Sequence, residues 1–267
     1  MLTILVINSK GGSGKTTLTT NLASYYASKK IRTAIMDYDP QGSSMQWLKM
    51  RAENPDNIHV EKIHGANAAA KGAAPLRSLQ TWVPVETEVL VIDAPAGAKD
   101  LLLQELVRKA TFIVIPVAPS PIDIHATAGF IKELFLFGGA RTSKAKIAVV
   151  ANRVRSASSP IYGALERFLT SLKLPFLTSI RDSENYLNAV EKGLGIFEMD
   201  EAVTAAERRE LMPIVKWLNG QFPNRFGSRI EDKAQSLEGS RKFAAFRMDP
   251  QNITTLSATG KFKSYTP

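Results

Sequence analysis

The sequence predicts an α/β fold: an open, mostly parallel twisted sheet with helices on both faces. Short apolar runs rich in β-branched residues recur along the chain, as is typical of strands buried on both faces of a parallel sheet. Amphipathic stretches of helical length lie between these runs, which gives a repeated strand–helix pattern. With 267 residues, 44% of them hydrophobic, the chain is long enough to bury a substantial core.

Each element is expected from its own pattern. The runs TILVIN, RTAIMD, EVLVID, TFIVIPVA and KIAVVAN predict strands over residues 3–8, 32–37, 88–93, 111–118 and 146–152. Amphipathic stretches predict helices over 16–30, 42–52, 99–110, 122–137, 160–172 and 205–220. Residues 64–78 are rich in Ala and Gly, and we expect a mobile loop or a weak helix there.

Composition excludes several kinds of site. The chain has no cysteine, so disulfides, thiolate nucleophiles, Cys-ligated zinc and iron–sulfur clusters are excluded. Its three scattered histidines argue against a His-built metal site. No apolar run approaches the roughly 18 residues of a membrane span, and the first run is too short for a signal peptide, so a cytoplasmic protein is expected. The net charge of +9 favours a polyanionic partner such as nucleic acid or an anionic membrane.

A boundary is expected near residue 220, because the sequence beyond it mixes phenylalanines with basic residues and shows little clear periodicity. Residues 221–267 hold 8 Lys/Arg and 4 Asp/Glu, which leaves 26 basic and 21 acidic residues for residues 1–220. We therefore expect a domain over 1–220 and a basic, aromatic-containing tail over 221–267. The tail is open to three interpretations: a flexible extra DNA contact, a strip that orders on a partner, or a disordered end.

The stretch NSKGGSGKTT, residues 8–17, follows the first strand and predicts a phosphate-binding loop. Its three glycines let backbone N–H groups turn toward a phosphate chain, and the helix that follows points its positive end at the same charge. Lys15 would reach the β- and γ-phosphates, and the Thr16 hydroxyl would bind Mg²⁺. The usual pattern has glycine where Ser9 stands, and a second lysine, Lys10, lies beside it.

Carboxylates follow two other predicted strands. Asp37 and Asp39 lie in DYDPQG, and Asp93 ends EVLVID. A carboxylate at a strand end near a phosphate loop can hold Mg²⁺ through water, and one two residues later can orient the attacking water. The alternatives are a turn at Asp39-Pro and a helix cap at Asp93.

In this order and spacing, KGGSGKTT, DYDPQGS, VIDAPAG, PVAPSPIDI and ANRV resemble the ParA/MinD family of deviant Walker P-loop ATPases over roughly residues 1–218. The resemblance implies that Lys10 crosses an ATP-sandwiched homodimer to the phosphates of the partner, and that Lys15 and Asp39 act in hydrolysis. It implies Mg²⁺ at Thr16, Asp37 and Asp93, and Asn152 at the adenine edge. The implied ATP-binding residues are Lys10, Gly11, Gly12, Ser13, Gly14, Lys15, Thr16, Thr17 and Asn152.

Members of this family bind either nucleoid DNA or the inner membrane. The end of the chain lacks the sustained apolar face of a membrane helix, so no membrane contact is expected and double-stranded DNA is favoured. Resembling proteins place their basic DNA contacts at positions that correspond here to Arg181, Lys192, Arg208, Arg209 and Lys216. For Arg208 and Arg209, flanked by glutamates, a solvated helix face is the alternative.

The resemblance implies a slow ATPase, stimulated by a cognate activator, that positions intracellular cargo such as plasmid or chromosome DNA or a protein assembly. No N-terminal DNA-reading domain is expected, because the first strand begins at once. The sequence leaves three alternatives: a metabolic synthetase of the dethiobiotin-synthetase type, a membrane-riding MinD-like ATPase, and a scaffold that binds ATP without hydrolysing it.

Overall fold

Parallel strands form one open sheet in the computed structural model, which describes residues 1–69, 83–220 and 226. All of these residues lie in one compact unit, Met1–Ile230. The sheet has the order β3-β2-β4-β1-β5-β6-β7, and every pairing in it is parallel. Within the described ranges its strands are β1 (Leu2–Val6), β2 (Thr33–Asp37), β3 (His64–Asn67), β4 (Val89–Asp93), β5 (Phe112–Val117), β6 (Lys146–Val154) and β7 (Phe176–Arg181).

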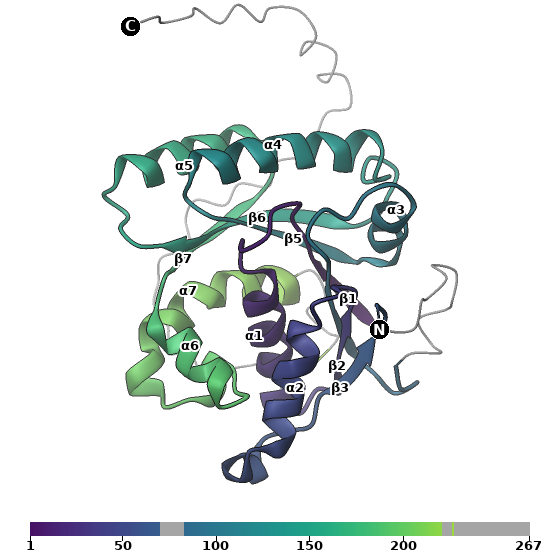
Figure 1. The fold of residues 1–267 in the computed structure, drawn as a ribbon, viewed down its shortest axis with the longest axis vertical. Coiled ribbons are helices and arrows are strands. Elements are labelled where there is room, and N and C mark those ends of the chain that lie inside the picture. Colours follow the sequence, from purple (N-terminus) through teal and green to yellow (C-terminus); the bar gives the residue numbers. More distant parts are fainter. Residues whose placement is uncertain (70–82, 221–225, 227–267) are drawn as a thin grey trace, which may run out of the picture. The chain divides into compact units, whose positions relative to one another are not determined.

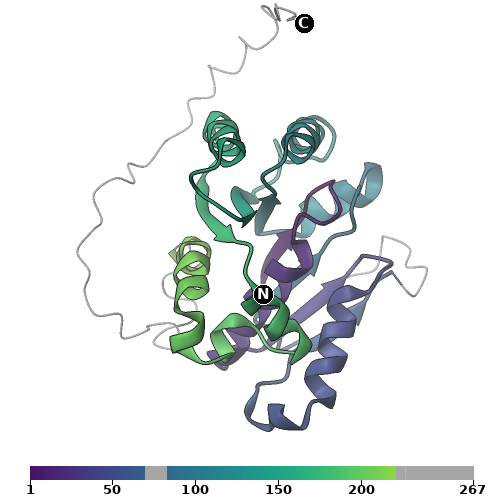
Figure 2. The ribbon, with the colours of Figure 1, turned by 60° about the vertical axis from the view of Figure 1, so that its left-hand side comes forward.

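Helices cover both faces of this sheet (Figures 1 and 2). One face packs against α3 (Asp100–Lys109), α4 (Pro121–Leu136) and α5 (Pro160–Ser171). The other packs against α1 (Lys15–Ser28), α2 (Ser43–Glu53), α6 (Glu184–Glu191) and α7 (Glu201–Gly220). Short 3₁₀ turns, η1 (Pro55–His59) and η3 (Ile196–Glu198), follow α2 and precede α7. The predicted fold class is therefore confirmed.

Local sequence explains where several helices begin. Ser120, Ser159 and Ser183 each precede a helix, and each side-chain oxygen accepts a hydrogen bond from a backbone N–H of the first turn. In α4 and α5 a proline follows the serine, at the position where its missing N–H costs nothing. Strands such as β1, β2 and β4 are buried throughout and mostly apolar because both their faces are covered.

The structure corrects the expectation for residues 64–78. Residues 64–67 form the edge strand β3, which pairs with β2, while residues 70–78 lie outside the described part of the chain. The strand has little apolar character because backbone hydrogen bonds hold it and much of it is exposed. Lys192 was expected inside a helix; it instead forms the C-cap of α6.

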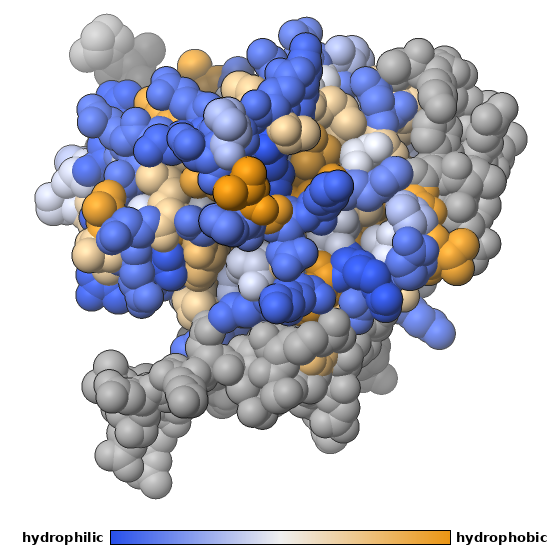
Figure 3. Space-filling view, turned by 90° about the horizontal axis from the view of Figure 1, so that it is seen from below, coloured by the Kyte–Doolittle hydropathy of each residue, from blue (hydrophilic) through white to orange (hydrophobic). Residues whose placement is uncertain are grey.

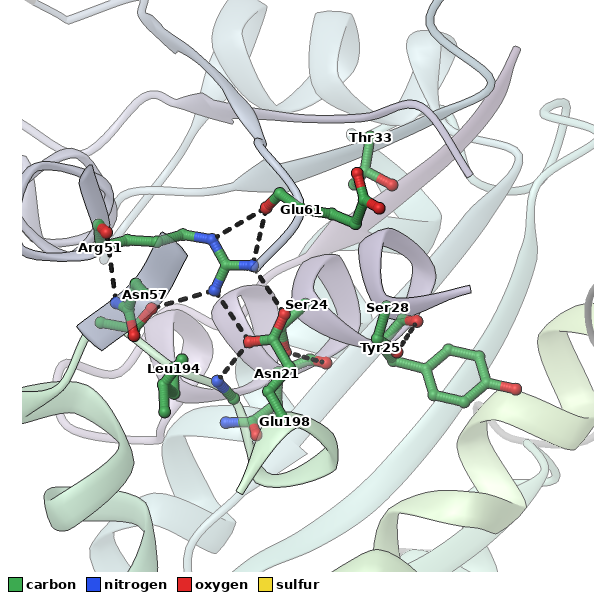
Figure 4. Close-up of polar contacts among 12 residues, drawn as sticks. Asn21, Ser24, Tyr25, Ser28, Thr33, Arg51, Asn57, Glu61, Leu194 and Glu198 are labelled. Atoms are coloured by element: carbon green, nitrogen blue, oxygen red, sulfur yellow. Dashed lines mark hydrogen bonds and ion pairs between the residues drawn. The ribbon is translucent and has the colours of Figure 1, made fainter. Parts of the chain in front are cut away.

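A buried ion pair joins α2 to the turn before α7 (Figure 4). The Arg51 guanidinium donates to both carboxylate oxygens of Glu198 at 2.6 and 2.8 Å, and each side chain is only 6% exposed. Arg51 also donates to the backbone carbonyls of Glu61 and Gly193. Asn21 of α1 accepts a bond from the backbone N–H of Ile196. The segment before α7 is therefore fixed to both α1 and α2.

None of the described helices is long and apolar enough to cross a membrane. Figure 3 shows one face of the molecule, on which hydrophobic residues form small separate groups among hydrophilic ones. On this face, the described residues offer no continuous apolar surface.

Candidate functional site

The predicted phosphate loop lies between the carboxyl end of β1 and the first turn of α1. Gly12 and Gly14 have φ values of +76° and +88°, a region that residues with a Cβ rarely adopt. The side-chain amide of Asn152 donates to the carbonyl of Ser13 at 2.8 Å. A Cβ on Gly14 would lie 1.9 Å from the Asn152 nitrogen. The loop thus needs glycine at Gly14 for both its conformation and its contact with β6.

The two lysines of the loop have different surroundings. The Lys15 ammonium is buried and donates to the carbonyl of Lys10 at 3.0 Å. Burial lowers the pKa of Lys15, while the charges of Asp93 and Asp39 oppose this effect. The ammonium of Lys10 has no hydrogen-bond or ion-pair partner among residues 1–69, 83–220 and 226. One lysine therefore serves the loop itself, and the other is available to a ligand.

Two buried carboxylates lie side by side at the carboxyl edge of the sheet. Asp37 and Asp93 are paired in the register of β2 and β4. Thr16 donates to Asp93 at 2.9 Å, and Ser44 donates to Asp37 at 2.6 Å. Burial, together with the neighbouring charge of Asp37, raises the pKa of Asp93 to about 7. A cation placed between these oxygens would offset that repulsion.

Asp39 lies beyond this pair on the loop that leads to α2. Its backbone N–H donates to Asp37 at 2.8 Å, and its own carboxylate accepts from the N–H of Gln41 at 2.9 Å. A pocket of about 420 Å³ opens between the phosphate loop, Asp39 and Pro95. Among the predicted site residues it is lined by glycines of the loop, Lys15, Thr16, Thr17 and Asp39. The structure therefore brings much of the predicted phosphate loop and Asp39 to one pocket, whereas Lys10, Asp37 and Asp93 are not among its lining residues.

The residues around this pocket fit a magnesium nucleotide. Backbone N–H groups at the start of α1 and a buried ammonium are donors for phosphate oxygens. The Thr16 hydroxyl and the carboxylates of Asp37 and Asp93 are the oxygen ligands that Mg²⁺ prefers. Asn152 is held against Ser13, so its contact with adenine stays a prediction.

Comparison with known proteins identifies a nucleotide-binding domain in this chain. The model of the CobQ/CobB/MinD/ParA nucleotide binding domain matches residues 4–196. The chain belongs to this family. The predicted family resemblance is confirmed, and the fold is that of a P-loop nucleotide-binding protein of the ParA/MinD type.

Relatives of this ParA/MinD-type chain include proteins named for positioning. It is 30% identical to maintenance of carboxysome distribution protein A of Halothiobacillus neapolitanus over 74% of this chain and 87% of that protein. It is 29% identical to the chromosome-partitioning ATPase Soj of Thermus thermophilus over 49% of this chain and 60% of that protein. These relatives support a positioning ATPase.

Solved structures show the same fold. The ATP complex of a Cyanothece McdA variant matches with a TM-score of 0.62 at 18% identity, over 82% of this chain and 96% of that one. MinD of Pyrococcus horikoshii complexed with Mg-ADP matches with a TM-score of 0.58 at 16% identity, over 86% of this chain and 99% of that one. Such neighbours support a nucleotide and Mg²⁺ for the family.

The five basic residues predicted to contact DNA differ in how free they are. Lys192, Arg209 and Lys216 are exposed and have no side-chain partner within the described ranges. Arg181 is 47% exposed, but its guanidinium pairs with Glu210 at 2.7 Å. All of these positions lie in or beside β7, α6 and α7.

Arg208 is held by the fold of this ParA/MinD-type domain. Its guanidinium donates to the carbonyls of Phe197 and Met199 at 3.3 and 2.7 Å and to the hydroxyl of Thr204 at 3.1 Å. The side chain is 21% exposed. These contacts fasten the turn before α7 to the helix, so they favour a structural role over contact with phosphate.

Sequence reasoning missed Arg153. This residue has a φ of +58° at a register shift between β6 and β7. Its guanidinium lies 3.4 Å from the carbonyl of Gly12 and 3.5 Å from Asp182, so it touches the phosphate loop. Its signal in the sequence is limited to its place directly after Asn152, because its positive φ is visible only in the structure.

Proposed function

We propose that this chain is an ATP-dependent switch that dimerises around nucleotide, binds DNA without sequence preference and positions intracellular cargo. The observation that carries the proposal is that one loop holds two lysines with different surroundings. Lys15 is bound within its own loop, whereas the Lys10 ammonium has no partner in the described residues. A second cation at the phosphates would neutralise charge that one loop leaves uncompensated, and it would tie dimerisation to the γ-phosphate.

Each site residue then has a role in slow hydrolysis. Lys15 would hold the β- and γ-phosphates, and Thr16, Asp37 and Asp93 would hold Mg²⁺, which when bound neutralises phosphate charge. Asp39 lines the same pocket, and its carboxylate would orient the attacking water. The partner subunit's Lys10 would complete the site, so loss of the γ-phosphate would release the dimer.

Exposed basic residues support binding to nucleoid DNA. Lys192, Arg209 and Lys216 would contact phosphates, and Arg181 would do so on leaving Glu210. We leave Arg208 out of this surface because backbone carbonyls hold it. We therefore propose a cytoplasmic, nucleoid-associated protein without a membrane contact.

The cargo is either DNA or a protein assembly, linked through a cognate activator. Both classes appear among the relatives, one named for carboxysome distribution and one for chromosome partitioning. A metabolic synthetase on the same scaffold is the second candidate, because the match to cobyrinic acid a,c-diamide synthase of Mycobacterium smegmatis shows that this fold also occurs there. A fast transfer of phosphate to a small acid would favour that candidate.

The decisive test is the mass of the Asp39→Ala variant in ATP and Mg²⁺, measured by light scattering after size exclusion. We expect dimers with ATP and monomers with ADP, since the variant binds but does not hydrolyse. Adding Lys10→Ala to this variant should leave the nucleotide affinity nearly intact and abolish the dimer. A variant that stays monomeric while binding ATP would contradict the proposal.

The DNA step has its own test. The Asp39→Ala dimer should retard random-sequence duplex at low salt with ATP and not with ADP. If the duplex is not retarded, the proposed DNA contact is wrong, but the proposed dimerisation is unaffected.

A further inference from the structure

Hydrogen-bonded side chains connect the loop of residues 38–42, which carries Asp39, to helix α3. Tyr38 lies between Asp37 and Asp39, and its backbone N–H donates to the carbonyl of Asp93 at 3.0 Å. Its phenol oxygen accepts a hydrogen bond from the Lys109 ammonium at 3.0 Å. The residue next to the proposed water-orienting carboxylate is thus held at both ends, by β4 and by α3.

The lysine that holds Tyr38 belongs to a buried ion pair. Lys109 pairs with Glu105 one turn earlier in α3, and their side chains are 12% and 6% exposed. The second carboxylate oxygen of Glu105 is buried and has no hydrogen-bond partner among the described residues. Burying both charges costs desolvation, and apolar residues of similar size would fill the same space without that cost. The pair is therefore better explained as orienting the Lys109 ammonium toward Tyr38 than as a contribution to stability.

The loop that carries Asp39 has few other anchors. Within residues 38–42, all of them described, Tyr38 is the only one whose side chain hydrogen-bonds to another element. The Asp39 carboxylate accepts from Gln41 inside the same loop. The backbone N–H of Asp39 donates to Asp37 of β2 at 2.8 Å, so the position of the Asp39 carboxylate depends on this bond and on where Tyr38 is held.

We propose that Glu105 and Lys109 position Tyr38, and that Tyr38 positions the Asp39 loop for hydrolysis. This inference rests on the proposed function, because it assigns a role in the same ATPase site. Tyr38, Lys109 and Glu105 are positioning residues, since none of them lines the pocket. Their effect should fall on the rate of the chemical step and leave the binding of ATP unchanged.

The test is single-turnover hydrolysis with enzyme in excess over ATP, with nucleotide affinity measured separately. Tyr38→Phe keeps the ring and removes the oxygen that accepts from Lys109. We expect its hydrolysis rate to fall about tenfold, since small displacements of catalytic groups have effects of this order or larger. Its affinity for ATP and its ATP-dependent dimerisation should match the wild type.

Two further variants guard against misfolding. Glu105→Gln combined with Lys109→Met removes both buried charges together, so no unpaired charge remains, and it should reproduce the slow hydrolysis. Arg108→Met is the matched control, because this neighbour on α3 is exposed, and it should leave the rate unchanged.

The outcomes separate the two proposals. If the wild type hydrolyses ATP and both Tyr38→Phe and the double variant keep its rate, the positioning role is wrong and the proposed function stands. If these variants lose thermal stability but keep the rate, the contact is purely structural and the inference is again overturned. If the wild type shows no hydrolysis in any condition, the proposed function itself fails.

Discussion

Gly14 is constrained by its neighbours as well as by its backbone. Its φ of +88° disfavours any side chain, and the Asn152 amide occupies the place of its Cβ. The spacing of the glycines and Lys15 was sufficient to predict the loop. It was insufficient to predict the contact between Asn152 and Ser13, since that contact depends on how β6 lies beside α1.

Gly14→Ala should therefore destabilise the protein and abolish nucleotide binding. We expect a loss above the roughly 1–3 kcal/mol that a strained φ costs alone, because the overlap with Asn152 adds to it. Urea unfolding and binding of a fluorescent ATP analogue measure both effects. Gly139→Ala is the matched control, with a φ of +76° and open space around its Cβ, and its loss should stay within the strain range.

The buried carboxylate Asp93 should make the site a source of instability. In nucleotide-free protein without Mg²⁺, Asp93→Asn should raise the free energy of unfolding at pH 8 by about 1–2 kcal/mol. The asparagine still accepts from Thr16 but carries no charge beside Asp37.

The pH dependence of this gain has a definite sign. Because the pKa of Asp93 rises from 3.8 unfolded to about 7 folded, its favourable contribution is complete below pH 4 and is lost as the pH rises through 7. The advantage of the variant should shrink between pH 8 and pH 5. Unfolding curves at these pH values measure it, and an equal advantage at both would show that charge is not the cause.

At the scale of elements, buried strands were predictable and edge strands were not. The sequences of β1, β2, β4, β5 and β6 are mostly apolar because helices cover both faces of the sheet. β3 has only four residues, of which one is buried, and its place is set by backbone pairing with β2. β7 begins with four half-buried residues, so its pattern was equally weak.

The ion pair between α2 and the turn before α7 should be important for stability. Arg51→Met would leave Glu198 buried without its partner, at a cost of about 3–5 kcal/mol. Denaturant unfolding measures this loss. Lys49→Met, on the same helix, breaks only the exposed pair with Glu53 and should change stability by less than about 0.5 kcal/mol.

At the scale of the whole molecule, the distribution of unpaired basic side chains decides which surface can bind DNA. The net charge of +9 was read directly from composition, yet it could not show which cations are free. The guanidinium groups of Arg181 and Arg208 already bind other groups of the protein. The side chains of Arg209 and Lys216 have no such partner among the described residues. Only packing distinguishes these two groups.

Lys216→Ala should weaken DNA binding in a salt-dependent way. If Lys216 contacts one phosphate, the slope of log K against log salt should fall by about 0.9, with no change in sequence preference. Binding to labelled duplex from about 50 to 200 mM salt measures the slope. Lys49→Ala, an exposed lysine on α2, is the control and should leave the slope unchanged.

Phe226 lies past the last described helix, yet it is 5% exposed and its ring centre is 5.7 Å from that of Tyr26. A protein shortened after Gly220 would lose this ring and leave an apolar hollow over α1, whereas one shortened after Ile230 would keep it. We expect the shorter form to melt several degrees lower, which paired calorimetry of the two would measure. The core of the folded domain thus includes Phe226, a residue that the sequence pattern assigns to the tail.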